Sequence, residues 1–354
     1  MTEEPIKPVE NVVYILGAGF SAPLGIPVMS NFLEKSKDMF SSDPDRWSRF
    51  KKVFQTIDRM YKSKGYFNAN LFNIEEILSI LEMNEELGGE TERSLFSNYI
   101  LDVVQYYTPQ MNNKPELGSW RHQAFGYNLL NSYGYFVGCL LGLSVSVNNQ
   151  ADFFCNRIGE ADILARYSVV TLNYDAVLEN CFSYLAQNFH ASDAFGFSRV
   201  LESDDAQFSQ RTHLAKLHGS VDTRVIVPPT WNKGLHENIK PDWRLAYKLL
   251  ANANHIRIIG YSLPSADAYV KYLLKAAIIN CEHLKSIDVM CLDFDGTVEK
   301  RYNEFICFPN YTFRNGHVED YLLNTYNACI NDGGVSPVLW MNGLEAGHKM
   351  SFGK

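Results

Sequence analysis

Five short apolar runs, rich in β-branched residues, stand out along the chain, and each ends in a polar or glycine-containing cluster. Such near-continuous hydrophobicity is typical of parallel strands in a sheet that is covered on both faces. The pattern predicts an α/β fold, a Rossmann-like parallel sheet with helices on both faces. The five predicted strands are Val12–Leu16, Ser168–Leu172, His213–Leu217, Ile256–Ile259 and Ile287–Leu292.

The long segment between the first two predicted strands, residues 30–165, has mainly helical periodicity. In "NIEEILSILEMNEEL" the apolar residues recur at helical spacing and the glutamates fall on the other side. Similar periodicity runs through Leu95–Tyr107 and Trp120–Leu143. We therefore expect a large helical insertion after the first strand.

The sequence as a whole fits a single domain spanning residues 1–354, with the helical segment inserted in it. A small second insertion is expected at residues 182–210, and residues 320–354 are expected to form a C-terminal tail. The sequence has no internal repeat and no low-complexity tract. No second, sensor-like domain is evident.

Composition and charge narrow the class of protein. A hydrophobic share of 46% and a charged share of 20% are those of a folded globular chain. The net charge of −8 argues against strong direct nucleic-acid binding, which uses clustered Lys and Arg. The polar start is unlike a targeting peptide, and Tyr133–Val147 is too short to span a bilayer. We expect a cytoplasmic protein without a membrane anchor.

The 7 cysteines are dispersed and include no C-x-x-C pair. A zinc site built from thiolates therefore has no sequence support, and no metal is expected. Scattered cysteines in a chain without a secretion signal indicate reduced thiols that pack as small apolar residues.

The first predicted strand runs into a glycine-rich turn, in "NVVYILGAGFSAPLGIP". Its segment Gly17-Ala18-Gly19-Phe20-Ser21, followed by Ala22, fits the G-x-G-x-x-G/A fingerprint of dinucleotide-binding turns. Backbone N–H groups of such a turn can hold a pyrophosphate without Lys or Arg. A dehydrogenase would add an acidic residue after a second strand, but Glu34 and Asp38 lie in a helical pattern. Hydride transfer therefore loses most of its support.

Polar residues also follow the other predicted strands. Because the ligand crevice of an open α/β sheet lies at the carboxyl ends of its strands, these clusters are expected to converge on one site. They are Asn173 and Asp175 in "TLNYDAVLE", His218, Gly219 and Ser220 in "KLHGSVD", Gly260 and Ser262 in "IIGYSLPSAD", and Asp293 in "DFDGT".

Structural roles remain open for several of these residues. Asn173 and Asp175 are also typical caps for the helix predicted to begin at Ala176. Asp267 is assigned to a helix start rather than to the site. "DFDGT" matches the D-x-D-G-T of aspartate-nucleophile phosphatases, but too little chain follows it for such a domain. A ribose contact by Asp293, or a simple turn, fits better.

Taken in this order, the clusters resemble the sirtuin superfamily, and most of all the sirtuin-like NAD-hydrolysing domains of bacterial anti-phage defence. The resemblance spans residues 11 to about 295 and lies in GAGFS with Gly25-Ile26-Pro27, NYD, LHGS and GYSLP. "PPTWNKG" (228–234) and the helix–strand–helix pattern of Trp243–Lys275 look like the same branch.

The resemblance implies that NAD is the substrate and that its nicotinamide–ribose bond is cleaved. Asn173 would position the ribose hydroxyls or the attacking water, and His218 would act as general base. Asp175 would orient Asn173 or add negative potential near the developing cation. Ser262 and Asp293 would contact the adenosine-side ribose. The residues implied to bind NAD are Gly17, Ala18, Gly19, Phe20, Ser21, Gly25, Pro27, Gly219, Ser220, Gly260, Ser262 and Asp293.

Departures from the protein-deacylating sirtuins favour water as the acceptor. Their G-I-P-D-F-R is Gly25-Ile26-Pro27 followed by Val28-Met29-Ser30 here, and their T-Q-N-I-D is Thr171-Leu172-Asn173-Tyr174-Asp175. Their zinc-binding cysteine pairs are absent. Two alternatives stay open: an NAD- or ADP-ribose-binding module without catalysis, and an NAD-dependent deacylase or ADP-ribosyltransferase.

Restraint is expected of such an activity, because an unregulated NAD hydrolase would exhaust the NAD of the cell. By family analogy, control would come from a homo-oligomer or from a separate defence partner, such as an ATPase or a nucleic-acid-guided protein. The helical insertion is the surface to test for assembly.

Overall fold

The fold is built around a sheet of six parallel strands in the order β10-β9-β8-β1-β4-β5. The computed structural model describes residues 9–64, 66, 71, 73–89, 92–111, 129–147, 153–158, 163, 165–200, 212–227, 237–265, 267–279, 281–331 and 339–354. The five predicted strands are confirmed, and β10 adds a sixth at one edge. The bounds are β1 Glu10–Leu16, β4 Ala165–Thr171, β5 His213–Lys216, β8 His255–Ile259, β9 Ser286–Cys291 and β10 Tyr311–Asn315.

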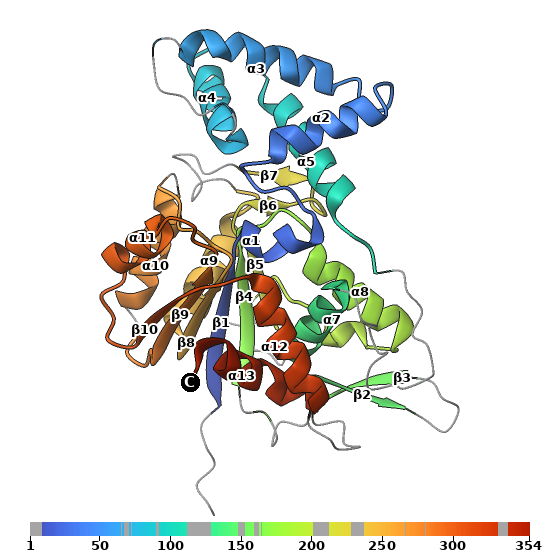
Figure 1. Ribbon diagram of the computed structural model, residues 1–354, viewed down its shortest axis with the longest axis vertical. Coiled ribbons are helices and arrows are strands. Elements are labelled where there is room, and N and C mark those ends of the chain that lie inside the picture. The colour runs from blue at the N-terminus through green and yellow to red at the C-terminus, as the bar shows by residue number, and fades with distance from the viewer. Residues whose placement is uncertain are drawn as a thin grey trace, which may run out of the picture.

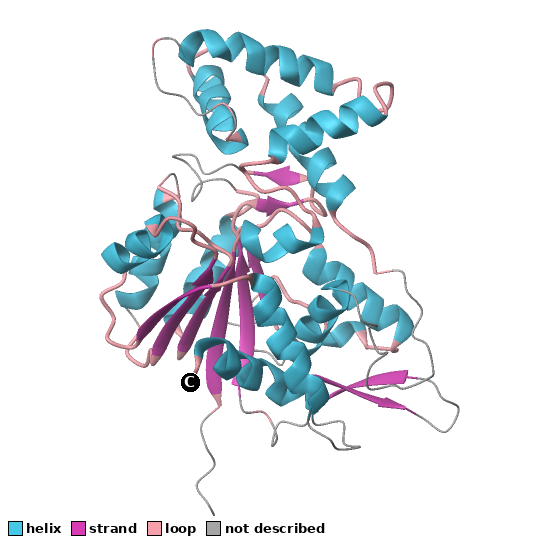
Figure 2. Ribbon diagram, in the orientation of Figure 1, coloured by secondary structure: helices cyan, strands magenta, loops and turns pink. Residues whose placement is uncertain are grey.

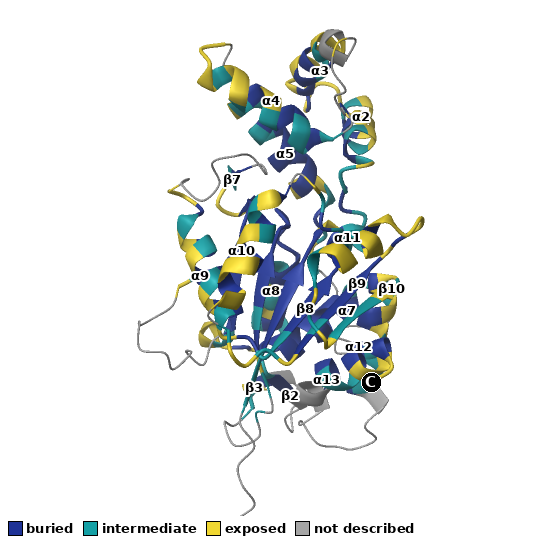
Figure 3. Cartoon of the chain, turned by 90° about the vertical axis from the view of Figure 1, so that its left-hand side faces the viewer, coloured by how far each residue is buried: buried dark blue, intermediate teal, exposed yellow. Residues whose placement is uncertain are grey.

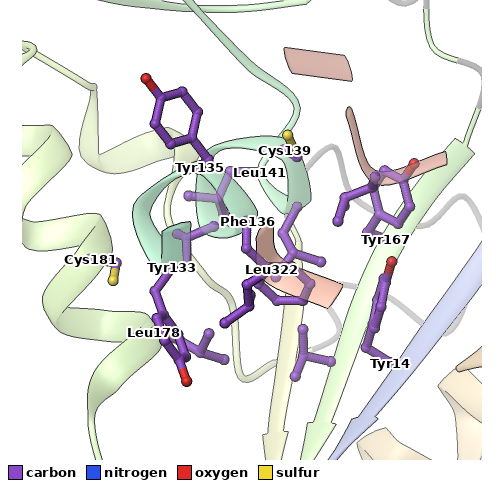
Figure 4. Close-up of a cluster of buried hydrophobic side chains, with 14 of the residues drawn as sticks. Tyr14, Tyr133, Tyr135, Phe136, Cys139, Leu141, Tyr167, Leu178, Cys181 and Leu322 are labelled. Carbon is purple, nitrogen blue, oxygen red and sulfur yellow. The ribbon is translucent and has the colours of Figure 1, made fainter. Parts of the chain in front are cut away.

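Helices cover both faces of the sheet (Figure 2), which confirms the Rossmann-like α/β fold. Side chains alternate along a strand, so Tyr14 and Leu16 of β1 face one core while Val13 and Ile15 face the other. The first core, part of which Figure 4 shows around Tyr14, packs against α7 Leu129–Leu140, α8 Val177–Asn188, α12 Val318–Asn331 and α13 Leu339–Phe352. The second packs against α9 Lys240–Ala251, α10 Ala268–Ile279 and α11 Thr297–Phe305.

Four helices of the segment between β1 and β4 build a separate layer, called here the helical module. It has its own buried core, in which Phe50, Leu78 and Tyr99 are almost inaccessible to solvent. Figure 1 shows the module beyond the carboxyl ends of the strands, and Figure 3 shows its buried faces turned inward. The helices are α2 Phe32–Ser42, α3 Phe50–Lys64, α4 Ile74–Glu86 and α5 Arg93–Tyr107.

The rest of the segment at residues 30–165 differs from a purely helical insertion. Helix α7 packs on the sheet, and β2 Leu143–Val147 pairs antiparallel with β3 Phe153–Arg157. In the predicted insertion at 182–210, α8 continues to Asn188 and a short 3-10 turn follows at Asp193–Phe195. Residues 201–211 and the "PPTWNKG" motif lie outside the described residues.

Residues 320–354 differ from the expected tail. They contain most of α12 and all of α13, which contact each other and α7. The physical reason is burial: Tyr321, Leu322 and Leu344 have no exposed surface and belong to the first core. Helices α12 and α13 therefore belong to the helical layer on this face of the sheet.

Candidate functional site

A cavity of about 680 Å³ lies at the carboxyl edge of the sheet and is lined both by residues that follow the strands and by residues of the helical module. The predicted clusters after β1, β4, β5 and β8 all contribute to its walls, as the topology requires. The end of β9 contributes Cys291 and Leu292, and the turn after β10 contributes Gly316 and His317. Asn73 and Glu75, at the start of α4, close it from the module.

The glycine turn brings the ends of β1 and β8 into backbone contact. Gly19 N donates to Gly260 O at 2.9 Å, and a Cβ on Gly19 would lie 2.8 Å from that oxygen. Gly17 N donates to Ile259 O, and Phe20 N donates to Gly17 O. Three of the turn's amides thus already have acceptors within the protein. These three N–H groups are therefore engaged within the protein, and the turn offers a phosphate fewer donors than its sequence pattern indicates.

Only part of the predicted glycine-turn set reaches the cavity. Ala18, Gly19 and Pro27 line it, whereas Gly17, Phe20, Ser21 and Gly25 are not among its lining residues. Phe20 packs in the core against Tyr133, whose O–H donates to Phe20 O. Gly25 O accepts a hydrogen bond from Lys35 Nζ at 2.8 Å.

Asn173 is fixed by two hydrogen bonds from its own amide. Its Nδ2 donates to Gly17 O at 2.9 Å and to Ser21 Oγ at 3.1 Å. The residue is 8% exposed and lines the cavity. Its Oδ1 is buried and has no hydrogen-bond partner in the described part of the chain. A buried amide oxygen of this kind is an acceptor that a bound hydroxyl or water would satisfy.

Asp175 precedes a helix and lines the cavity. Its Oδ1 accepts from Val177 N, the first residue of α8, although the N-cap position itself is Ala176. Burial raises the pKa of Asp175, and the nearby Lys216 ammonium opposes that rise. Lys216 Nζ donates to Asp175 O and to Glu179 Oε1, both at 2.6 Å. Nothing in the sequence singled out this buried lysine.

His218 is 2% exposed, lines the cavity and lies between two carboxylates. Its Nδ1 is 3.9 Å from Glu75 Oε1, and its Nε2 is 3.6 Å from Asp267 Oδ1. Tyr174 donates to Glu75 Oε1 at 3.5 Å, and Tyr261 donates to Asp267 Oδ2 at 3.1 Å.

Both carboxylates differ from the sequence interpretation. Asp267, assigned to a helix start, does precede α10, but its carboxylate lies beside His218 in the cavity. The glutamates of α4 were expected on the helix side away from its core, yet Glu75 faces the sheet edge. Its place next to His218 depends on how the module sits on the sheet, which no local pattern encodes.

Gly219 and Ser220 are not among the lining residues. They form β6, Gly219–Ser220, which pairs with β7, Val225–Ile226. Ser220 Oγ accepts from Lys216 Nζ at 3.0 Å, so this turn holds the buried lysine.

Gly260 and Ser262 line the cavity as predicted, but Asp293 does not. Asp293 Oδ2 accepts from Glu299 N, and Asp293 N donates to Asn315 Oδ1, both at 2.9 Å. These contacts order the loop between β9 and α11, which fits the turn interpretation of "DFDGT".

A known family model matches the central part of the chain. Residues 167–301 match the family model of the SIR2-like domain. This part of the chain is therefore similar to SIR2-like domains. The matched range includes Asn173, His218 and Gly260, whereas the glycine turn and the helical module of the chain precede it.

Solved structures similar to the chain include several Sir2 proteins. SIR2 in complex with the inhibitor EX-527, 2'-O-acetyl-ADP-ribose and deacetylated p53 peptide is 13% identical, with a TM-score of 0.35, over 92% of this chain and 95% of that chain. Sir2 bound to an acetylated peptide and Sir2 with a p53 peptide and NAD+ are each 13% identical, with a TM-score of 0.35, over 94% of this chain and 96% of the other. No curated protein matches the chain.

Among the described residues, no group of three or more His, Cys, Asp or Glu side chains is arranged to hold a metal ion. Within the same part of the chain, no helix combines the length and hydropathy needed to cross a bilayer.

Proposed function

We propose that this chain binds NAD in the cavity and hydrolyses its nicotinamide–ribose bond. The observation that carries the proposal is the placement of Asn173 and His218 on the walls of one cavity, inside the SIR2-like range. The volume of the cavity, about 680 Å³, lies within the range of about 300 to 1,000 Å³ that is usual for small-molecule and cofactor sites.

In this proposal the reaction is the transfer of ADP-ribose to water. The bond between the ribose carbon and the nicotinamide nitrogen breaks, and its electron pair leaves with nicotinamide. A water oxygen bonds to the same carbon and loses a proton. The products are nicotinamide, ADP-ribose and one proton.

Asn173 suits the positioning of the nucleophile or of a ribose hydroxyl. Its Nδ2 is held by Gly17 O and Ser21 Oγ, so the side chain cannot turn without losing both bonds. The buried Oδ1 that remains accepts one hydrogen bond from a water or a hydroxyl. That bond fixes the donor oxygen on the cavity wall.

His218 suits general-base chemistry because imidazole titrates near neutral pH. It is almost fully buried, so water competes little for its ring nitrogens. Asp175, Asp267 and Glu75 line the same cavity. Where they are ionised, their negative charge stabilises the cationic ribose that develops as nicotinamide leaves.

The test is incubation of the purified full chain with NAD and chromatography of nicotinamide and ADP-ribose. We expect turnover, alone or with an activating partner, and a loss of about 100-fold or more in kcat for His218→Ala and for Asn173→Ala. The exposed His283 provides the control, because His283→Ala should keep wild-type turnover.

Other outcomes of the same assay would replace the proposal. NAD binding without any nicotinamide release would favour a binding module. Labelled ADP-ribose attached to a protein would indicate a transferase. Nicotinamide release that requires an acyl-lysine peptide would indicate a deacylase.

We also propose that the activity serves bacterial anti-phage defence by depleting NAD in the cytoplasm. The support is the resemblance of the glycine turn, NYD, LHGS and GYSLP to that branch of the superfamily. Restraint would come from self-assembly or from a separate partner. Phage-infected cells that express the wild type should lose NAD, and cells that express His218→Ala should not.

A further inference from the structure

The helical module supplies one of the two carboxylates that flank His218, although it lies outside the SIR2-like range. Glu75 is in the first turn of α4, where the side chain of Asn73 accepts from Glu75 N at 3.0 Å and from Glu76 N at 3.3 Å. This cap fixes the helix start. Ile74 and Ile77 are buried in the core of the module, which fixes the rotation of the helix.

Tyr174 joins the module to the sheet at the same point. It follows β4 in the NYD cluster, but its ring belongs to the buried core of the module. Its O–H donates to Glu75 Oε1 at 3.5 Å, and its ring centroid is 6.0 Å from that of His218. The carboxylate of Glu75 is therefore held from both layers of the protein.

We infer that Glu75 is a positioning residue for His218, so that the helical module completes the active site. A neutral imidazole has one donor and one acceptor nitrogen. At 3.9 Å from Nδ1 the carboxylate of Glu75 is too far for a direct hydrogen bond, but its charge acts at this distance. An ionised Glu75 therefore stabilises the positive charge that the ring gains when it takes a proton from a ribose hydroxyl or water.

The other ionisable groups around His218 belong to the sheet side of the cavity. Asp267 Oδ1 lies 3.6 Å from Nε2, and Tyr261 donates to the second oxygen of that carboxylate. The gap of 3.6 Å is longer than a hydrogen bond, so Asp267, like Glu75, acts on the ring through its charge. Asp267 faces Nε2, whereas Glu75 faces Nδ1.

The first test is a pH titration of the His218 imidazole in the Glu75→Gln variant. The titration is monitored by ¹⁵N NMR of the full chain, and the His218 signals are assigned by their loss in His218→Ala. The variant keeps the shape of the side chain and removes its charge. We expect the midpoint of the His218 titration to fall by about one pH unit or more. Glu86→Gln is the matched control, since Glu86 is exposed at the end of the same helix, and it should titrate as wild type.

The second test rests on the proposed function. In Glu75→Gln, kcat for NAD hydrolysis should fall about 10- to 100-fold, because the protonated His218 ring loses a stabilising charge, and each pKa unit lost is about 1.4 kcal/mol. KM should change by less than about threefold, and the acid limb of the kcat profile should move to lower pH. A merely structural role would not shift that limb.

The two hypotheses can fail separately. A Glu75→Gln protein with the wild-type titration of His218 and the wild-type pH profile would overturn the role of Glu75 alone. A wild type that never cleaves NAD would overturn the proposed function, while the NMR titration would still decide whether Glu75 controls His218.

Discussion

At the scale of single residues, Lys216 is the cation beside two carboxyl groups, the buried Asp175 of the site and the partly exposed Glu179. The residue is 1% exposed, and its Nζ contacts Asp175, Glu179 and Ser220. Burial raises the pKa of both Asp175 and Glu179, and Lys216 opposes the rise in each case. A carboxyl group with a raised pKa stabilises the fold below its unfolded pKa and loses that contribution as pH rises.

We therefore expect Lys216→Met to lower the free energy of unfolding by about 3 kcal/mol at neutral pH, because it leaves buried charge without a partner. The loss should be larger at pH 8 than at pH 5, where protonation relieves the carboxylates. Urea unfolding at the two pH values measures both effects. The control is Lys285→Met: Lys285 is half exposed and pairs with Glu10, so its removal should cost less than about 1 kcal/mol. Equal losses in the two variants would contradict this account.

Residues of the site fall into two groups, those that directly follow a strand of the sheet and those that reach the site from elsewhere. Asn173, His218, Gly260 and Ser262 could be predicted, since parallel strands bring their carboxyl ends to one edge. Glu75 could not, because its contact joins α4 to a loop that follows β5 far along the chain. A lone buried lysine or a helix-start aspartate gives no sequence signal of its own.

At the scale of elements, the contact between the ends of β1 and β8 depends on Gly260. Its φ is +68°, and a Cβ there would lie 2.3 Å from Phe20 N. We expect Gly260→Ala to destabilise the protein by about 3 kcal/mol or more. The cost of a left-handed backbone conformation at alanine and the cost of the clash between its Cβ and the backbone of Phe20 add to each other. Gly296→Ala is the matched control: its φ is +77° with no atom within 4 Å, so about 1 kcal/mol is expected. Thermal unfolding of the two variants checks the difference, and similar losses would show that the clash is relieved elsewhere.

Strands and helices could be predicted where their own sequence shows a clear pattern of apolar and polar residues. Buried strands such as β1 show as continuous apolar runs because helices cover both of their faces. The edge strand β10, Tyr311–Asn315, has no fully buried residue, so its sequence is mixed and was not recognised. Helices α12 and α13 were expected to be a tail for another reason. Their apolar faces are buried only by packing against α7 and the sheet, which are distant in the sequence.

At the scale of the whole molecule, a buried polar network ties α13 to the sheet, on the face shared with α7 and α12. Arg257 of β8 donates to Tyr14 Oη at 2.9 Å and to Glu345 Oε2 at 2.7 Å. His348 Nε2 lies 3.0 Å from Asp288 Oδ2 of β9, and Lys354 Nζ pairs with the other oxygen of that carboxylate. The last helix is thus attached through ionisable groups as well as through apolar packing.

This network makes the stability of the fold sensitive to acid. Burial lowers the pKa of His348 from 6.5 to about 4, against the opposing hydrogen bond with Asp288. Burial alone would raise the pKa of Asp288, but hydrogen bonds from His348 and Lys354 hold it at about 2. Both pKa values are below those of the unfolded chain, so both groups stabilise the fold at neutral pH and lose that contribution on acidification. The stabilising contribution of His348 is lost as pH falls from 6.5 to 4, and that of Asp288 is lost below pH 4.

The expected signature is a loss of about 3 kcal/mol in the free energy of unfolding between pH 7 and pH 4 from His348 alone. In His348→Gln the protein should be less stable at pH 7, because the contact with Asp288 changes, but its further loss on acidification should be smaller than that of the wild type by about this amount. Urea unfolding by circular dichroism at both pH values measures it. His283→Gln replaces an exposed histidine and should keep the wild-type dependence on pH. If His348→Gln lost stability with acid as steeply as the wild type, the attachment of α13 would have to depend on apolar contacts such as Leu344 and Phe352 instead.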